Sequence, residues 1–148
     1  MTITWRNFAI TNPPKRSPES IAKTEKELGV KLPADFLAVA AMHQGRACSP
    51  NCFDLPDGSS SALGYVSIFE DEPRDDRIVS PWNNAVAVPD GVIPFSRDGG
   101  GDLICFDYRK TPDHPTVVFR DHEKCDDPPL YVACSFTDFL NKLYDEPD

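Results

Sequence analysis

The chain has 148 residues, of which 40% are hydrophobic and 26% charged, and a formal net charge of −9. This length suits one domain with its own core. The negative charge excludes a general nucleic-acid binder, because phosphate contacts need clustered Lys and Arg. It also excludes a protein that docks on anionic membranes. Fifteen prolines, about twice the usual frequency, limit long helices and exclude an all-helical bundle.

The first elements in chain order are two short helices. The triplet Ser-Pro-Glu at 17–19 is a helix start, with a cap, a proline at the first position and an acidic residue at the positive end. Gly29 is placed to end this helix. A second helix starts at Pro33 and stops at Gly45, so the pair should form a tight helical hairpin.

Residues 46–61 are rich in Pro, Asn, Asp and Ser, and we expect a surface loop there. Five segments rich in β-branched and aromatic residues follow, and the short polar gaps between most of them favour antiparallel pairing. These predicted strands cover residues 63–69, 92–95, 103–108, 116–119 and 131–134.

The last helix begins at a Ser135 cap with Asp138 three residues further on, which resembles a capping box. Its apolar residues at helical spacing share one face. They are Phe136, Phe139, Leu140 and Leu143. Helices at both ends of a run of strands predict an α+β fold.

The charge is distributed unevenly along the chain. Residues 1–48 carry seven basic and four acidic residues, whereas residues 49–148 carry eight basic and twenty acidic residues, a net of −12. Such runs are commonly solvated faces, and the functional alternative is an acidic surface for a basic partner. The three acidic clusters are Glu70, Asp71, Glu72, Asp75 and Asp76; Asp121, Glu123, Asp126 and Asp127; and Asp145, Glu146 and Asp148.

The N-terminus MTITWRNFAI lacks the apolar run of a signal peptide, and no segment approaches the ~18 apolar residues of a membrane span. An odd number of cysteines argues against a disulfide framework. We therefore expect a cytoplasmic protein with free thiols and no cofactor, and burial of Cys105 and Cys134, which lie in apolar runs. The other cysteines are Cys48, Cys52 and Cys125.

The most distinctive motif consists of Asp98, Gly99, Gly100, Gly101 and Asp102. It lacks the lysine of a phosphate-binding loop and the ligand spacing of an EF-hand. We interpret it as a tight turn between two core strands, in which Asp98 and Asp102 bond backbone amides and Gly100 takes a positive φ.

Two weaker constellations could carry chemistry. His43, Cys48 and Cys52 have the spacing of a partial zinc site, which needs a fourth ligand such as Cys125 or His122. The triplet Asp121-His122-Glu123 could be an acid–base cluster, but no nucleophile motif accompanies it, so a polar turn is favoured. We expect no catalytic residue and no bound metal.

The ordered set of motifs over residues 17–144 resembles the SUKH superfamily of bacterial immunity proteins and fungal cell-wall synthesis regulators. Each piece is ordinary turn or core chemistry, and only their order and spacing are specific. The matching pieces are Glu27-Leu28-Gly29, Lys31-Leu32-Pro33-x-Asp35-Phe36, Gln44-Gly45, Val92-Ile93-Pro94-Phe95, Asp98 to Asp102, Leu103-Ile104-Cys105-Phe106-Asp107, Thr116-Val117-Val118-Phe119, Asp121-His122-Glu123, and Ala133 with Ser135-Phe136-x-Asp138-Phe139-Leu140.

The resemblance implies one SUKH-like domain over 1–148, with a twisted, mainly antiparallel sheet flanked by the helical hairpin and the last helix. It implies an immunity protein that binds and neutralises a basic toxin domain, such as a nuclease, without contacting nucleic acid or membrane. The alternatives are a scaffold or regulatory module of the same fold and a zinc-binding protein. We expect the partner contacts to be Glu70, Asp71, Glu72, Asp75 and Asp76, with Trp82 as an aromatic anchor.

Overall fold

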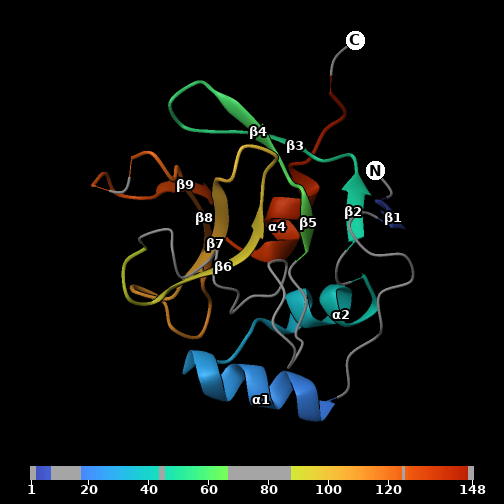
Figure 1. Cartoon of the computed structure of the whole chain (residues 1–148), viewed down its shortest axis with the longest axis vertical. Helices are drawn as coiled ribbons and strands as arrows, with labels where there is room; N and C mark the ends of the chain where they lie inside the picture. Colours follow the sequence, from blue (N-terminus) through green and yellow to red (C-terminus); the bar gives the residue numbers. More distant parts are fainter. Residues whose placement is uncertain (1–2, 8–17, 44–45, 67–87, 125, 147–148) are drawn as a thin grey trace.

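A computed structural model describes residues 3–7, 18–43, 46–66, 88–124 and 126–146. Mixed helices and antiparallel sheets make up this part of the chain, which confirms the predicted α+β class (Figure 1). Its helices are α1 (Pro18–Leu28), α2 (Ala34–His43) and α4 (Phe136–Asn141). All three lie within the predicted helical segments.

The helical hairpin is tied together at its connection and to the sheet. The Glu25 carboxylate in α1 accepts a hydrogen bond from the backbone N–H of Leu32 (2.6 Å), and the Tyr108 hydroxyl donates to the carbonyl of Lys31 (2.8 Å). These two bonds satisfy the backbone N–H of Leu32 and the carbonyl of Lys31 in the short connection that leads into α2.

The start of α4 has the predicted cap. The Ser135 hydroxyl accepts from the backbone N–H of Asp138 (3.0 Å), and the Asp138 carboxylate accepts from the backbone N–H of Cys134 (3.1 Å). Cys134 is exposed in this cap, so the expectation that it is buried was wrong, whereas Cys105 is fully buried as expected. Capping, rather than core packing, determines the position of Cys134.

Five strands form one antiparallel sheet in the order β5-β6-β7-β8-β9, so every strand pairs with its chain neighbour. The short gaps between most of the predicted strands indicated this pairing. Residues 67–69 of the first predicted strand lie outside the described residues. The strands are β5 (Tyr65–Val66), β6 (Val92–Arg97), β7 (Leu103–Asp107), β8 (Thr116–Arg120) and β9 (Leu130–Ala133).

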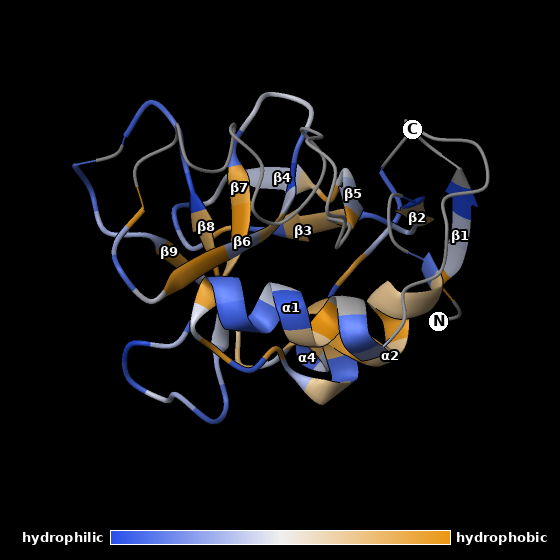
Figure 2. Cartoon of the chain, turned by 60° about the horizontal axis from the view of Figure 1, so that its bottom comes forward, coloured by the Kyte–Doolittle hydropathy of each residue, from blue (hydrophilic) through white to orange (hydrophobic). Residues whose placement is uncertain are grey.

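Both faces of the central strand β7 are buried. Ile104 and Phe106 point into the larger core with the helices, whereas Leu103 and Cys105 belong to a second, smaller cluster. Successive residues of a strand face opposite sides of its sheet, so two buried faces require a continuous apolar run. On the larger side, α4 packs against β8 and β9 and α2 packs against α4, and Figure 2 shows these helices gathered below the strands.

The expected loop at 46–61 is wrong, because it contains β2 (Arg46–Ser49), β3 (Cys52–Asp54) and the start of β4 (Ser60–Ala62). Strand β2 pairs with β1 (Thr4–Asn7), which the sequence did not indicate, and β3 pairs with β4. Residues 50–51 and 55–59 lie between these strands, whereas Ser49, Asp54 and Ser60 lie within them.

Burial explains the error at 46–61. Ala47, Cys48 and Phe53 are each only 1% exposed, so the segment contributes to the core although turn residues dominate its composition. Single buried residues between turns do not produce a recognisable period in a sequence.

Phenylalanine rings join the helices to the sheet. Phe36 of α2 meets Phe95 of β6, Phe106 of β7 and Phe136 of α4 edge-on, with ring centroids 5.5, 5.1 and 5.2 Å apart. All four rings are at most 1% exposed. Edge-to-face pairs of this kind add about 0.5–1.5 kcal/mol each beyond burial of apolar area.

We expect Gly64→Ala to lower the free energy of unfolding by about 1–3 kcal/mol. A Cβ at Gly64 would lie 2.3 Å from the backbone oxygen of Arg97, which accepts a hydrogen bond from Gly64 N–H, so strands β5 and β6 would have to separate locally. Urea denaturation followed by circular dichroism measures the change.

Gly99→Ala is the matched control, because a Cβ at Gly99 meets nothing within 4 Å. It should change the free energy of unfolding by about 0.5 kcal/mol or less. Equal stability of the two variants would contradict the close approach at Gly64.

Candidate functional site

The residues predicted to contact a partner, Glu70 to Asp76 and Trp82, lie outside the described residues, so their role stays a prediction. The acidic cluster at 121–127 lies in the connection between β8 and β9 and is described except for Cys125. It faces the Asp98–Asp102 turn through side-chain contacts, and this region is the candidate site.

The Asp98–Asp102 turn joins β6 to β7 and is organised by its first carboxylate. Asp98 Oδ1 accepts hydrogen bonds from the backbone N–H groups of Gly100 and Asp102, both at 2.9 Å. The glycine with a positive φ is Gly101 (+93°) and not Gly100, which corrects the expected position. The left-handed conformation thus falls at the last glycine before the turn closes.

The second oxygen of Asp98 connects this turn to a neighbouring hairpin. Asp98 Oδ2 accepts from the hydroxyl of Ser61 in β4 at 2.8 Å. The carboxylate is therefore fully engaged, with one oxygen bonded inside the turn and the other to the β3–β4 hairpin. Its role in the structure is to position two chain segments against each other.

Asp102 connects the same turn to the β8–β9 connection. Its Oδ1 accepts from the backbone N–H of His122 (2.9 Å) and lies 2.6 Å from the Nδ1 of the same residue. The imidazole side chain is 31% exposed. The hydrogen bond to Asp102 raises the pKa of His122, because a carboxylate partner favours the charged ring.

Arg120 holds the β8–β9 connection from inside. It is only 3% exposed, and its guanidinium donates to the backbone carbonyls of Lys124 (3.0 Å) and Asp127 (2.6 Å). Buried cations are uncommon and need bonded partners. Sequence reasoning missed this residue, because an arginine at the end of an apolar strand gives the same pattern whether it is buried or solvated.

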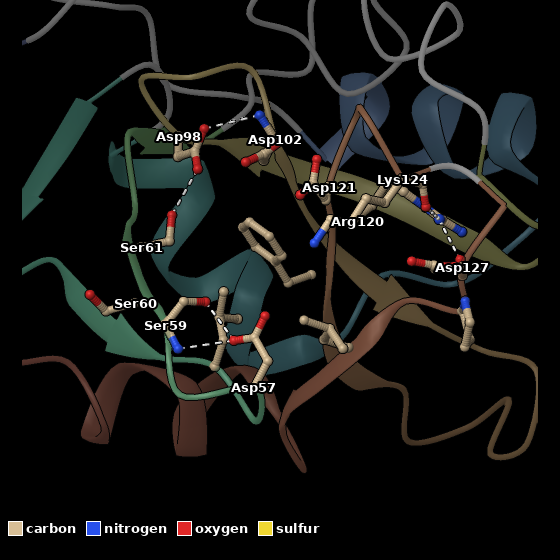
Figure 3. A pocket seen from close by; sticks show the side chains of 14 residues that line it. Asp57, Ser59, Ser60, Ser61, Asp98, Asp102, Arg120, Asp121, Lys124 and Asp127 are labelled. Atoms are coloured by element: carbon tan, nitrogen blue, oxygen red, sulfur yellow. Dashed lines mark hydrogen bonds between the residues drawn. The ribbon is translucent and has the colours of Figure 1, made fainter.

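The β3–β4 hairpin, the β6–β7 turn and the β8–β9 connection surround a pocket of about 360 Å³. Figure 3 shows the polar side chains around the hollow, with Asp57 and Ser59 across from Asp98 and Asp102. Asp57, Lys124 and Asp127 are exposed and Asp98 and Asp102 half-buried, whereas the floor includes the buried Leu55 and Phe119. The lining residues are Leu55, Asp57, Ser59, Ser60, Ser61, Asp98, Asp102, Phe119, Arg120, Asp121, Lys124, Asp127, Pro128 and Leu130.

Carboxylates dominate the charge of the pocket, with five aspartates against one arginine and one lysine. At the rim, Asp57 Oδ1 accepts from the hydroxyl (2.5 Å) and the backbone N–H (3.0 Å) of Ser59. These bonds hold the pKa of Asp57 below its ordinary value. The pocket is thus an acidic concavity whose carboxylates are held in place by backbone and side-chain donors.

The structure does not assemble the zinc set suggested by His43, Cys48 and Cys52. Among the described residues, the only group of three potential ligands within 4.8 Å of one another is Asp102, Asp121 and His122. His43 stacks on Trp5 with ring centroids 4.9 Å apart. Burial raises the pKa of the Cys48 thiol to about 11, which disfavours the thiolate that zinc requires.

Sequence reasoning did not bring the pocket together. Its β3–β4 residues belong to the segment expected to be an irregular loop, and the approach of Ser61 to Asp98 spans 37 positions. The one available signal was the pairing order of the strands, which places the turns after β6 and β8 at the same edge of the sheet.

The pairing of His122 with Asp102 predicts a pH-dependent contribution to stability. The folded-state pKa of His122 is raised above its unfolded value of about 6.5, so the contribution is complete below that pH and is lost as pH rises through the folded pKa. The melting temperature should therefore fall more on His122→Gln near pH 6 than near pH 9.

In the Asp102→Asn background, His122→Gln should lower the melting temperature equally near pH 6 and near pH 9, because the amide cannot stabilise the charged ring. Thermal denaturation of the wild type, both single variants and the double variant across pH tests the pair. A His122→Gln effect that is independent of pH would contradict it.

Comparison with known proteins identifies one relationship. No curated protein and no solved structure gives a significant match. No helix in the described ranges combines the length and apolar character needed to cross a membrane. The family model described as SMI1 / KNR4 family (SUKH-1) matches residues 15–142, which is most of the chain. The chain therefore belongs to the SMI1/KNR4 (SUKH-1) family of the SUKH superfamily.

Proposed function

We propose that this protein is a cytoplasmic immunity protein that binds a cognate bacterial toxin and blocks it without catalysis. The observation that carries the proposal is the family match over residues 15–142, because SUKH proteins are generally non-catalytic immunity or regulatory proteins that bind a partner protein. Fold alone does not assign a partner, so the charge and the site must support the choice.

The charge distribution favours a basic partner. Residues 49–148 carry a net charge of −12, and a toxin that cleaves nucleic acid has a basic substrate groove. Complementary potentials accelerate encounter and make binding depend on salt. We place the first contacts at Glu70, Asp71, Glu72, Asp75 and Asp76, with Trp82 as an anchor.

The described site also suits binding better than chemistry. Covalent catalysis that used His122 and Asp102 would need an activated nucleophile beside the imidazole. The Ser61 hydroxyl donates to Asp98 instead, and the bonds of Asp98 are all used to join chain segments. Polar groups fixed in this way support a preformed surface for a partner.

Co-expression with a cognate toxin domain, sought among the genes that neighbour this one, tests the proposal. We expect restored growth of the host and co-purification of the two proteins in equal amounts. Co-purification without rescue would support the scaffold or regulatory alternative instead. The absence of both growth rescue and co-purification would refute the immunity role with that toxin.

We expect simultaneous reversal of Asp71, Glu72, Asp75 and Asp76 to lysine to weaken toxin binding about tenfold or more at low salt. The loss should shrink in about 0.5 M salt, because screening removes long-range attraction. Isothermal titration calorimetry measures the affinity, and circular dichroism checks that the fold is retained.

The control reverses two charges, those of Glu19 and Glu27, which are exposed residues of α1 in the part of the chain with a net positive charge. This variant should bind as the wild type does. Equal affinity of the cluster variant and the wild type at low salt would remove residues 71–76 from the interface.

A further inference from the structure

We propose that the pocket between the β3–β4 hairpin, the β6–β7 turn and the β8–β9 connection receives an arginine side chain of the protein partner. This inference rests on the proposed function in assuming a basic partner, and it uses only described residues of the chain. The pocket, its floor and its charges each point to this occupant.

The pocket is large enough to admit one long side chain. Its volume of about 360 Å³ lies at the lower end of the range of roughly 300–1,000 Å³ found for small-molecule sites. Side chains that anchor protein interfaces fill pockets of this kind, and arginine is one of the residues enriched there.

The floor of the pocket suits the apolar stem and the flat face of an arginine. Phe119 and Leu55 are 5% and 7% exposed, and Leu130 at the start of β9 is half-buried beside them. An arginine stem covers apolar surface while its charged head stays near polar groups, and a guanidinium also stacks favourably on an aromatic ring.

Three carboxylates around this floor offer acceptors from three different chain segments. Asp57 comes from the β3–β4 hairpin, Asp102 from the β6–β7 turn and Asp121 from the β8–β9 connection. Within the described part of the chain, one oxygen of each is bonded by Ser59, His122 or Glu123, and the other oxygen accepts no hydrogen bond.

This arrangement favours arginine over lysine. A guanidinium has five N–H donors in one plane and can meet two or three separated carboxylates, whereas an ammonium acts as a point charge. The carboxylates are already held by their first hydrogen bonds, so binding requires little further ordering of their side chains.

Arg120 and Lys124 are the two cations that line the pocket. Arg120 is buried and donates to backbone carbonyls, so Lys124 is the exposed cation of the lining that competes for the same charges. It is exposed at the rim and its charge contributes to lowering the pKa of Asp57. Removing Lys124 should therefore tighten binding of a basic probe, whereas removing an aspartate charge should weaken it. Two variants of one pocket then change affinity in opposite directions.

Titration of the ¹⁵N-labelled protein with N-acetyl-L-arginine methylamide, followed by NMR chemical shifts, tests the pocket without any toxin. We expect saturable shifts confined to amides of 57–61, 98–102 and 119–130. N-acetyl-L-citrulline methylamide has nearly the same shape without the charge and should bind at least about threefold more weakly.

Asp57→Asn keeps an oxygen for the Ser59 donors and removes the charge, and Asp121→Asn does the same for the Glu123 donor. Each should weaken the arginine probe about threefold, and Lys124→Met should tighten it about threefold. Asp113→Asn, an exposed residue of the β7–β8 connection outside the pocket, is the control and should have no effect.

Equal binding of citrulline, shifts elsewhere in the chain, or variants without the opposite signs would overturn the inference. Failure of the proposed function is read separately, from growth rescue by the wild type. If the wild type neutralises the toxin and a variant with both Asp57→Asn and Asp121→Asn keeps full affinity for it, the pocket is not the partner's contact.

Discussion

The contact of Phe36 with rings from β6, β7 and α4 is the constraint on which the rest of the structure depends. It brings together residues 36, 95, 106 and 136, so the helical hairpin, the sheet and the last helix share one interior. The rings lie at most 6.2 Å from one another between centroids, and each is almost fully excluded from water. Loss of one ring would leave a cavity lined by the remaining elements and would destabilise the fold, because the interior is close-packed.

The position of the candidate site follows from this core. Strands β6 and β8 both pair antiparallel with β7, so they run in the same direction and end at the same edge of the sheet. The turn after β6 and the connection after β8 therefore meet there, and the Asp102–His122 contact joins them. The bond from Ser61 to Asp98 adds the β3–β4 hairpin, so rigid strands support each wall of the pocket.

Sequence patterns were sufficient for the helices, the antiparallel order and the Asp98–Asp102 turn, because capping residues, apolar periods and turn residues act locally. They failed where burial depended on distant segments. Cys48 and Phe53 are buried among turn residues, and Arg120 is buried although it is charged. The positive φ at Gly101 rather than Gly100 depends on how the Asp98 carboxylate closes the turn, which composition does not specify. The pocket depends on these nonlocal effects, so no short sequence motif could predict it.

In the proposed role, the two acidic regions would act on different steps of association. The acidic residues of 49–148, among them those of 70–76, would attract a basic partner over about one Debye length, ~8–10 Å at physiological salt. This attraction would raise the rate of encounter. A pocket with a buried apolar floor and fixed carboxylates acts only at contact and slows dissociation. Affinity between related partners is tuned mainly through dissociation, so a preformed pocket is the part of this surface best suited to distinguish one basic toxin from another.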